Sequence, residues 1–83
     1  MKIVWDEPKR HANIARHGMD FADLDDAFFE SAVIVPGKQG RLVAVGHHSL
    51  GVILVAFAVL GTEGISVISM RRASRKERRL VDG

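Results

Sequence analysis

The sequence of 83 residues contains no cysteine, which excludes disulfide bonds and thiolate metal sites. Its longest apolar run, residues 51–60, is much shorter than the roughly 18 residues that a membrane-spanning helix needs. The N-terminus turns acidic and polar within a few residues, unlike a signal peptide. We therefore expect a single cytoplasmic domain spanning residues 1–83, with no membrane partner and a core of modest size.

Positive and negative charges are separated along the chain. The net charge is only +2, but residues 20–30 carry five acids and no base. Residues 71–79, RRASRKERR, carry six cations and one acid. Clustered Arg and Lys bind polyanions through charge attraction and counterion release. The basic segment therefore indicates a phosphate-bearing partner, with a solvated charged helix as the alternative.

Two helices are predicted in the N-terminal half. Asp6 is a good N-cap for a helix over residues 7–17, which Gly18 ends. This helix has a thin apolar stripe, formed by Ala12, Ile14 and Ala15. A second helix is predicted from Asp20 to Ser31, with Asp23 in a capping-box position. Its apolar face consists of Phe21, Leu24, Ala27 and Phe28, and we expect all four phenylalanines, including Phe29 and Phe57, in the core.

Strand patterns occupy the rest of the chain. After a brief strand over residues 2–5, runs at residues 31–35, 41–48, 51–60 and 64–69 are separated by short turns. Consecutive strands with short turns predict an antiparallel sheet of three to four strands, covered by helices on one face. The class is therefore α+β.

A short basic helix is predicted at the C-terminus. Ser74 and Glu77 form a capping box, S-x-x-E, at its start. This places Arg71 and Arg72 between the last strand and the helix. Only three residues are left to pack the helix: Ala73, Leu80 and Val81.

The order of these segments resembles that of the small RelE-like toxin ribonucleases, and two stretches resemble signatures of the BrnT toxin family. The first is WDEPKRHANIARHGMDF and the second is ISMRRASRKERR. The matching residues are Trp5, Asp6, Lys9, Asn13, Arg16, His17, Gly18 and Phe21, with Arg41 and Gly46 between the signatures.

The resemblance implies a toxin of a type II toxin-antitoxin pair that cleaves RNA without a cofactor. Its expected partner is a BrnA-like antitoxin with a DNA-binding domain, in a heterotetramer that reaches operator DNA only through the antitoxin. Ser66 stands where the family commonly has Arg or Lys, and no aromatic follows Glu77 and Arg78. These departures leave open a catalytically degenerate module that binds RNA or the antitoxin. A DNA-binding protein is disfavoured, because nothing resembles a helix-turn-helix.

The arginines suggest a mechanism. RNA cleavage through the 2'-oxygen requires cations that stabilise the charge on the phosphoryl oxygens, and the planar guanidinium suits this role. We expect Arg41, Arg71 and Arg72 to form this phosphate clamp, with salt bridges to the acidic second helix or simple solvation as the alternative. Further RNA contacts are expected from Arg75, Lys76, Arg79, Lys9 and His47. No His pair has metal-ligand spacing, so no metal site is expected.

Overall fold

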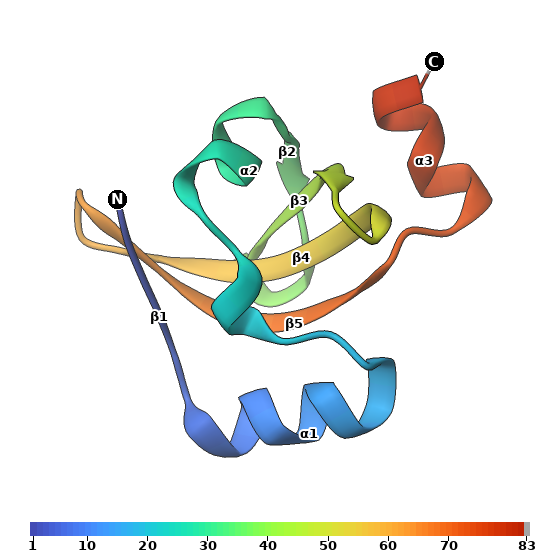
Figure 1. The fold of residues 1–83 in the computed structure, drawn as a ribbon. Coiled ribbons are helices and arrows are strands. Elements are labelled where there is room, and N and C mark those ends of the chain that lie inside the picture. The colour runs from blue at the N-terminus through green and yellow to red at the C-terminus, as the bar shows by residue number, and fades with distance from the viewer. Residues whose placement is uncertain (83) are drawn as a thin grey trace.

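One five-stranded mixed sheet forms the centre of the computed structural model, which describes residues 1–82 (Figure 1). The strand order is β1-β5-β4-β3-β2. The strands are β1 (Lys2–Trp5), β2 (Val33–Pro36), β3 (Leu42–His48), β4 (Gly51–Leu60) and β5 (Gly64–Arg72). The α+β class is confirmed, but the expected three- to four-stranded antiparallel sheet is too small. The first strand adds a fifth member because it pairs in parallel with β5.

The last strand is longer than its alternating pattern suggested. β5 continues to Arg72, and Arg71 and Arg72 pair with Leu54 and Ile53 of β4. The prediction that both arginines lie between strand and helix is therefore wrong. The strand extends because β4 is ten residues long and offers backbone partners up to this point.

Helix α1 (Glu7–His17) has the predicted bounds and caps. The Asp6 carboxylate accepts a hydrogen bond from the Lys9 N–H at 3.2 Å, and Gly18 ends the helix with φ of 69°. The prediction that an apolar stripe docks this helix is wrong, because the residues of the stripe, Ala12, Ile14 and Ala15, are all exposed.

A polar side chain docks α1 instead. Asn13 is the one buried residue of the helix. Its Nδ2 donates to the carbonyl oxygens of Met19 and Met70, both at 2.9 Å. Its Oδ1 accepts from the Met70 N–H at 3.0 Å. One buried amide thus joins α1, the loop that follows it and β5.

The predicted second helix is broken in two. The structure has a 3₁₀ turn, η1 (Phe21–Asp23), and a short helix, α2 (Asp26–Ser31), with Leu24 extended between them. The Asp20 carboxylate accepts from the Ala22 N–H and the Asp25 carboxylate accepts from the Phe28 N–H, each at 2.9 Å. The helix restarts because aspartates compete for backbone N–H groups that a continuous helix would use.

The sheet has two differently covered faces. On one face α1, η1 and α2 cover the larger apolar cluster, which includes Phe21, Phe28, Phe57 and Met70. Phe29 packs against this cluster, so the core positions expected for the phenylalanines are confirmed. Gly46 lets α2 lie close to β3, since an added Cβ would come within 3.1 Å of the Phe28 ring and of the Ala32 Cβ.

The opposite face carries a smaller cluster of Val45, Val52 and Leu54. It is partly covered by α3 (Arg75–Asp82), which Ser74 caps as predicted. Ala73 and Val81 pack against this cluster, but Leu80 is 46% exposed and the expectation that it packs is wrong. No helix within residues 1–82 is long and apolar enough to cross a membrane.

Candidate functional site

A groove of about 420 Å³ lies on the sheet face opposite α1 and α2. It runs between α3 and the connection from β2 to β3, which contains the 3₁₀ turn η2 (Lys38–Gly40). Its floor is aliphatic, and its charged lining residues are Lys38, Arg41, Arg71 and Glu77. The full lining consists of these four with Val35, Pro36, Gly37, Val43, Val45, Leu54, Ala56 and Leu80.

A bulge in β5 turns Arg71 into this groove. The register between β4 and β5 shifts so that Ala56 lies opposite Ser69 while Phe57 lies opposite Val67. Ile68 is therefore the extra residue. Val67 and Met70 consequently both face the larger cluster, and the next residue, Arg71, faces the groove. Uninterrupted alternation would have pointed Arg71 into the core.

The Arg71 side chain forms hydrogen bonds on both sides of the connection between β5 and α3, to Arg72 and to Glu77. Its Nη1 and Nη2 donate to the two carboxylate oxygens of Glu77 at 2.8 and 2.9 Å. Nη1 also donates to the Arg72 carbonyl at 3.1 Å. Glu77 in turn accepts from the Ser74 N–H at 2.8 Å. The expected alternative of a salt bridge to the acidic second helix is therefore wrong, because the acid comes from α3 itself.

The pairing of Arg71 with Glu77 fixes the charges of both side chains. The hydrogen bond from Arg71 is the main cause that lowers the pKa of Glu77 to about 2, opposed by partial burial. The same bond raises the pKa of Arg71. A guanidinium has five N–H donors. Three of those of Arg71 are used, and its Nε–H and second Nη2–H have no acceptor among residues 1–82.

Arg41 reaches the same groove from the other wall. Its backbone closes the η2 turn, where the Arg41 N–H donates to the Lys38 carbonyl at 3.1 Å. Its side chain is exposed and pairs with no acid within the described residues 1–82. Arg41 and Arg71, 30 positions apart in the sequence, thus line one groove.

Arg72 is not part of this group. It follows Arg71 in the strand and donates to the Leu50 carbonyl in the turn between β3 and β4. Lys38, by contrast, lines the groove although sequence reasoning gave it no role, since a lysine in a turn carries no distinguishing signal. Glu77 was recognised only as a helix cap.

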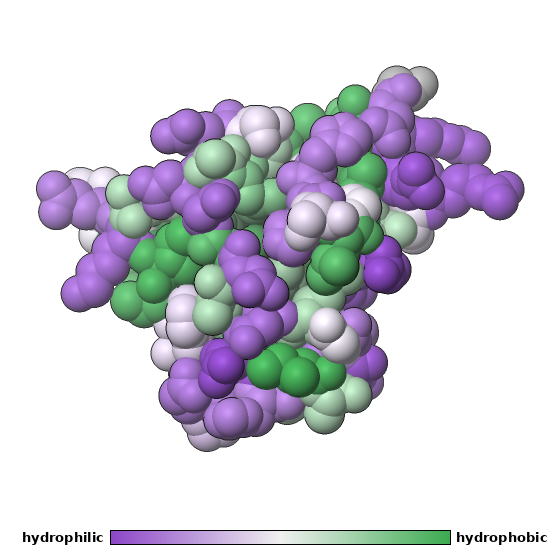
Figure 2. All heavy atoms as spheres, viewed as in Figure 1, coloured by the Kyte–Doolittle hydropathy of each residue, from purple (hydrophilic) through white to green (hydrophobic). Residues whose placement is uncertain are grey.

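The remaining predicted RNA contacts are distributed unevenly. Arg75, Lys76 and Arg79 are exposed on α3, where hydrophilic side chains project at the upper right of Figure 2. His47 lies beside the same helix, with its Nε2 3.3 Å from the Asp82 carboxylate. Lys9 is exposed on α1, which covers the other face of the sheet. His48, next to His47 in β3, packs edge-on against Phe28, so the two histidines point to opposite faces of the sheet.

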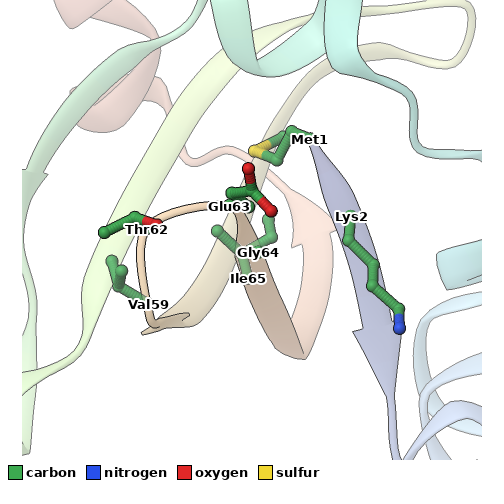
Figure 3. A pocket seen from close by; sticks show the side chains of 7 residues that line it. All are labelled: Met1, Lys2, Val59, Thr62, Glu63, Gly64 and Ile65. Carbon is green, nitrogen blue, oxygen red and sulfur yellow. The ribbon is translucent and has the colours of Figure 1, made fainter.

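Another hollow lies elsewhere on the surface and is lined by fewer charged side chains than the groove. It has a volume of about 620 Å³ and is lined by the start of β1 and the hairpin between β4 and β5 (Figure 3). Its charged residues are Lys2 and Glu63, and the Lys2 side chain points away from the others. Within residues 1–82 no group of three or more His, Asp or Glu side chains is placed to hold a metal ion.

Comparison with known proteins agrees with this fold. Residues 5–77 match the sequence model of a family described as the ribonuclease toxin, BrnT, of type II toxin-antitoxin systems. The crystal structure of the Brucella abortus ribonuclease toxin, BrnT, superposes with a TM-score of 0.84 at 56% sequence identity. That match covers 90% of this chain and 99% of the Brucella chain. A comparison with curated proteins finds no match. The chain therefore belongs to the BrnT family of ribonuclease toxins of type II toxin-antitoxin systems.

Proposed function

We propose that this toxin cleaves RNA by metal-independent phosphodiester transfer, with the scissile phosphate held in the groove between Arg41 and Arg71. The observation that carries the proposal is the convergence of these two guanidinium groups on one groove from distant parts of the chain. Arg71 is already fixed by Glu77 and still has an Nε–H and an Nη2–H to donate. These two donors lie side by side and match two phosphate oxygens.

The chemistry follows from this placement. The 2'-oxygen of one nucleotide attacks the adjacent phosphorus, the bond from phosphorus to the 5'-oxygen breaks, and a 2',3'-cyclic phosphate forms. The 2'-proton passes to a base, and the leaving 5'-oxygen takes up a proton. Negative charge accumulates on the non-bridging oxygens, which Arg41 and Arg71 stabilise. Loss of one such donor costs about 2.7–4 kcal/mol of transition-state stabilisation, or roughly 10²–10³-fold in rate.

The cations beside the groove extend the proposed RNA surface. Arg75, Lys76 and Arg79 project from α3 and can bind phosphates on either side of the cleavage point. His47 lies next to this helix. Arg72 and Lys9 are not part of the proposed surface. Arg72 is hydrogen-bonded to the turn at Leu50, and Lys9 lies on α1, which covers the opposite face of the sheet.

The partner assignment is part of the same proposal. A toxin of this class acts with an antitoxin, and we propose a BrnA-like protein whose DNA-binding domain brings the complex to operator DNA. Two toxins and two antitoxins form the proposed heterotetramer in the cytoplasm.

The test is cleavage of a labelled RNA by purified toxin in excess chelator. The variants Arg41→Lys and Arg71→Lys keep the charge but lose the planar fork. Arg16→Lys, exposed on α1, is the matched control. We expect a loss of about 10²-fold or more for each groove variant and none for the control. Circular dichroism checks that all variants are folded.

Each result has a distinct meaning. Equal cleavage by all four proteins contradicts the clamp, and loss of cleavage on adding chelator contradicts the metal-independent mechanism. Salt-dependent RNA binding without cleavage indicates the degenerate module instead. Two departures from the family pattern motivate this second function, Ser66 and the absence of an aromatic residue after Glu77 and Arg78. Ser66 lies on β5 opposite Ala58 of β4. Ser66 is five residues from Arg71, or about 16 Å along a strand, so it lies outside the proposed clamp.

A further inference from the structure

We propose that Lys38 is the general acid of the cleavage reaction, and that its ammonium group gives a proton to the leaving 5'-oxygen. This inference rests on the proposed function, because it deepens the chemistry of the groove that holds Arg41 and Arg71. The reaction requires such a donor, since an alkoxide is a strong base and leaves slowly without a proton.

The other charged residues of the groove cannot supply this proton. A guanidinium is not deprotonated in proteins, whereas a lysine ammonium can release a proton. This excludes Arg41 and Arg71. Glu77 is the one acid that lines the groove, and the hydrogen bond from Arg71 lowers its pKa to about 2. Glu77 is therefore ionised at neutral pH and has no proton to give.

No histidine takes the role of the acid in the groove that residues 1–82 describe. None of the four histidines belongs to its lining, and two of them lie on α1 across the sheet. His48 packs against Phe28 on that opposite face. His47 has its Nε2 3.3 Å from the Asp82 carboxylate, outside the groove. Lys38 is thus the one lining side chain that carries a transferable proton at neutral pH.

The turn that carries Lys38 has a strained and closely packed backbone. Gln39 has φ of 57°, which among residues 1–82 is the one positive value outside glycine. The Gly37 N–H donates to the Arg41 carbonyl at 2.8 Å, which closes the turn. A Cβ added to Gly37 would come within 3.0 Å of the Val43 side chain on β3. Such strain persists only where the surrounding structure imposes it, and it is concentrated at functional sites.

The proposed step transfers one proton from Lys38 to the leaving group. As the bond from phosphorus to the 5'-oxygen breaks, its electron pair stays on that oxygen, which takes a proton from the Lys38 Nζ. Lys38 becomes a neutral amine and recovers its proton from water, while the 2'-proton passes through the base to solvent. The anionic phosphodiester favours the charged form of a nearby amine, so Lys38 enters each cycle as an acid rather than as a base.

The experiment compares two substrates of the full-length toxin in excess chelator. One is a labelled RNA, and the other is the same RNA with sulfur in place of the 5'-oxygen at the linkage that is cut. A thiol has a pKa of about 8.5, against about 15.7 for water, which an alcohol resembles. The sulfur therefore leaves as a thiolate without needing a proton.

The variant Lys38→Arg keeps the positive charge but cannot transfer a proton. We expect it to cleave the ordinary RNA about 10²–10⁴-fold more slowly than the unmodified toxin, the usual contribution of a general acid. On the sulfur substrate we expect a rate within about threefold of that of the unmodified toxin, because a thiolate is a weak base.

Two further variants complete the comparison. Lys2→Arg is the matched control, since Lys2 is exposed and lines no part of the groove, and it should cleave both substrates at the unmodified rate. Arg71→Lys should be slow on both substrates, because the non-bridging oxygens need its planar fork whichever atom leaves.

Two outcomes would overturn the assignment of Lys38: an unchanged rate of RNA cleavage by Lys38→Arg, or an equal loss on both substrates, which would make Lys38 a phosphate contact only. If Arg71→Lys is slow in either case, the proposed function stands without this proton donor. Restoration of Lys38→Arg by sulfur with a fully active Arg71→Lys would contradict the clamp and keep the donor. Absence of cleavage of both substrates by the unmodified toxin would contradict the proposed function and the role of Lys38 with it.

Discussion

Replacement of Asn13 by alanine should destabilise the protein strongly, although the change removes only three heavy atoms. Asn13 is 5% exposed and makes three hydrogen bonds to backbone groups of Met19 and Met70. Each contributes about 1 kcal/mol net, and the buried backbone groups left behind are unsatisfied. We expect a loss of about 3 kcal/mol in the free energy of unfolding. For a domain of this size each kcal/mol lowers Tm by roughly 4–8 °C, so Tm should fall by about 12–24 °C.

The assay is urea unfolding followed by the fluorescence of Trp5. This is the single tryptophan, and its ring packs edge-on against Phe21 with centroids 6.4 Å apart. Unfolding separates the two rings and exposes the indole. Arg16→Ala, an exposed change on the same helix, is the control and should alter stability by less than about 0.5 kcal/mol.

Asn13→Asp separates loss of bonds from loss of packing. The aspartate carboxylate can still accept the hydrogen bond from the Met70 N–H. It has no proton to donate to the carbonyl oxygens of Met19 and Met70, which it then faces without a hydrogen bond. Burial and these carbonyls raise the pKa of such a carboxyl above its unfolded value, so this variant should gain stability as the pH falls through the raised pKa. If Asn13→Ala is as stable as Arg16→Ala, the reasoning about α1 docking is refuted.

Three further predictions concern α3 and α2. Glu77→Gln keeps the cap but loses the Arg71 ion pair. Because Arg71 is 39% exposed and screened, we expect a cost of about 1 kcal/mol at pH 7. The pKa of Glu77 is about 2 in the folded protein, against an ordinary value of 4.5. In acid unfolding the unmodified protein should therefore lose the stability contributed by the ion pair as the pH falls from 4.5 to 2 and Glu77 is protonated, whereas the variant should not show this loss. Gly46→Ala should cost about 1–3 kcal/mol in urea unfolding, because its Cβ meets Phe28 at 3.1 Å. Ser74→Ala should cost about 1 kcal/mol of α3 stability, measured as faster amide exchange in this helix.

Features with local causes were predictable from the sequence. The bounds of α1 followed from Asp6 and Gly18, and the capping box at Ser74 located α3. The ten-residue apolar run became β4 in the centre of the sheet. Each of these signals lies within a few residues of the element that it specifies.

Features that depend on distant partners were not predictable. The parallel pairing of β1 with β5 joins residues about 60 positions apart, and no turn sequence encodes it. Asn13 belonged to a recognisable signature, but its role depends on backbone groups of Met70, which lies 57 positions away. The break at Leu24 required a choice between two aspartate caps, and periodicity alone could not make it.

The position of Arg71 shows most directly why the site had to be seen in three dimensions. Strand alternation alone assigns Arg71 to the face of Val67, where a buried cation would be prohibitively costly. The bulge at Ile68 moves it to the groove. Asn13 holds the backbone of Met70 immediately before it, and Glu77 holds its side chain from α3. Two buried or partly buried contacts therefore fix the position of this guanidinium, and such preorganisation is what the proposed phosphate clamp would require.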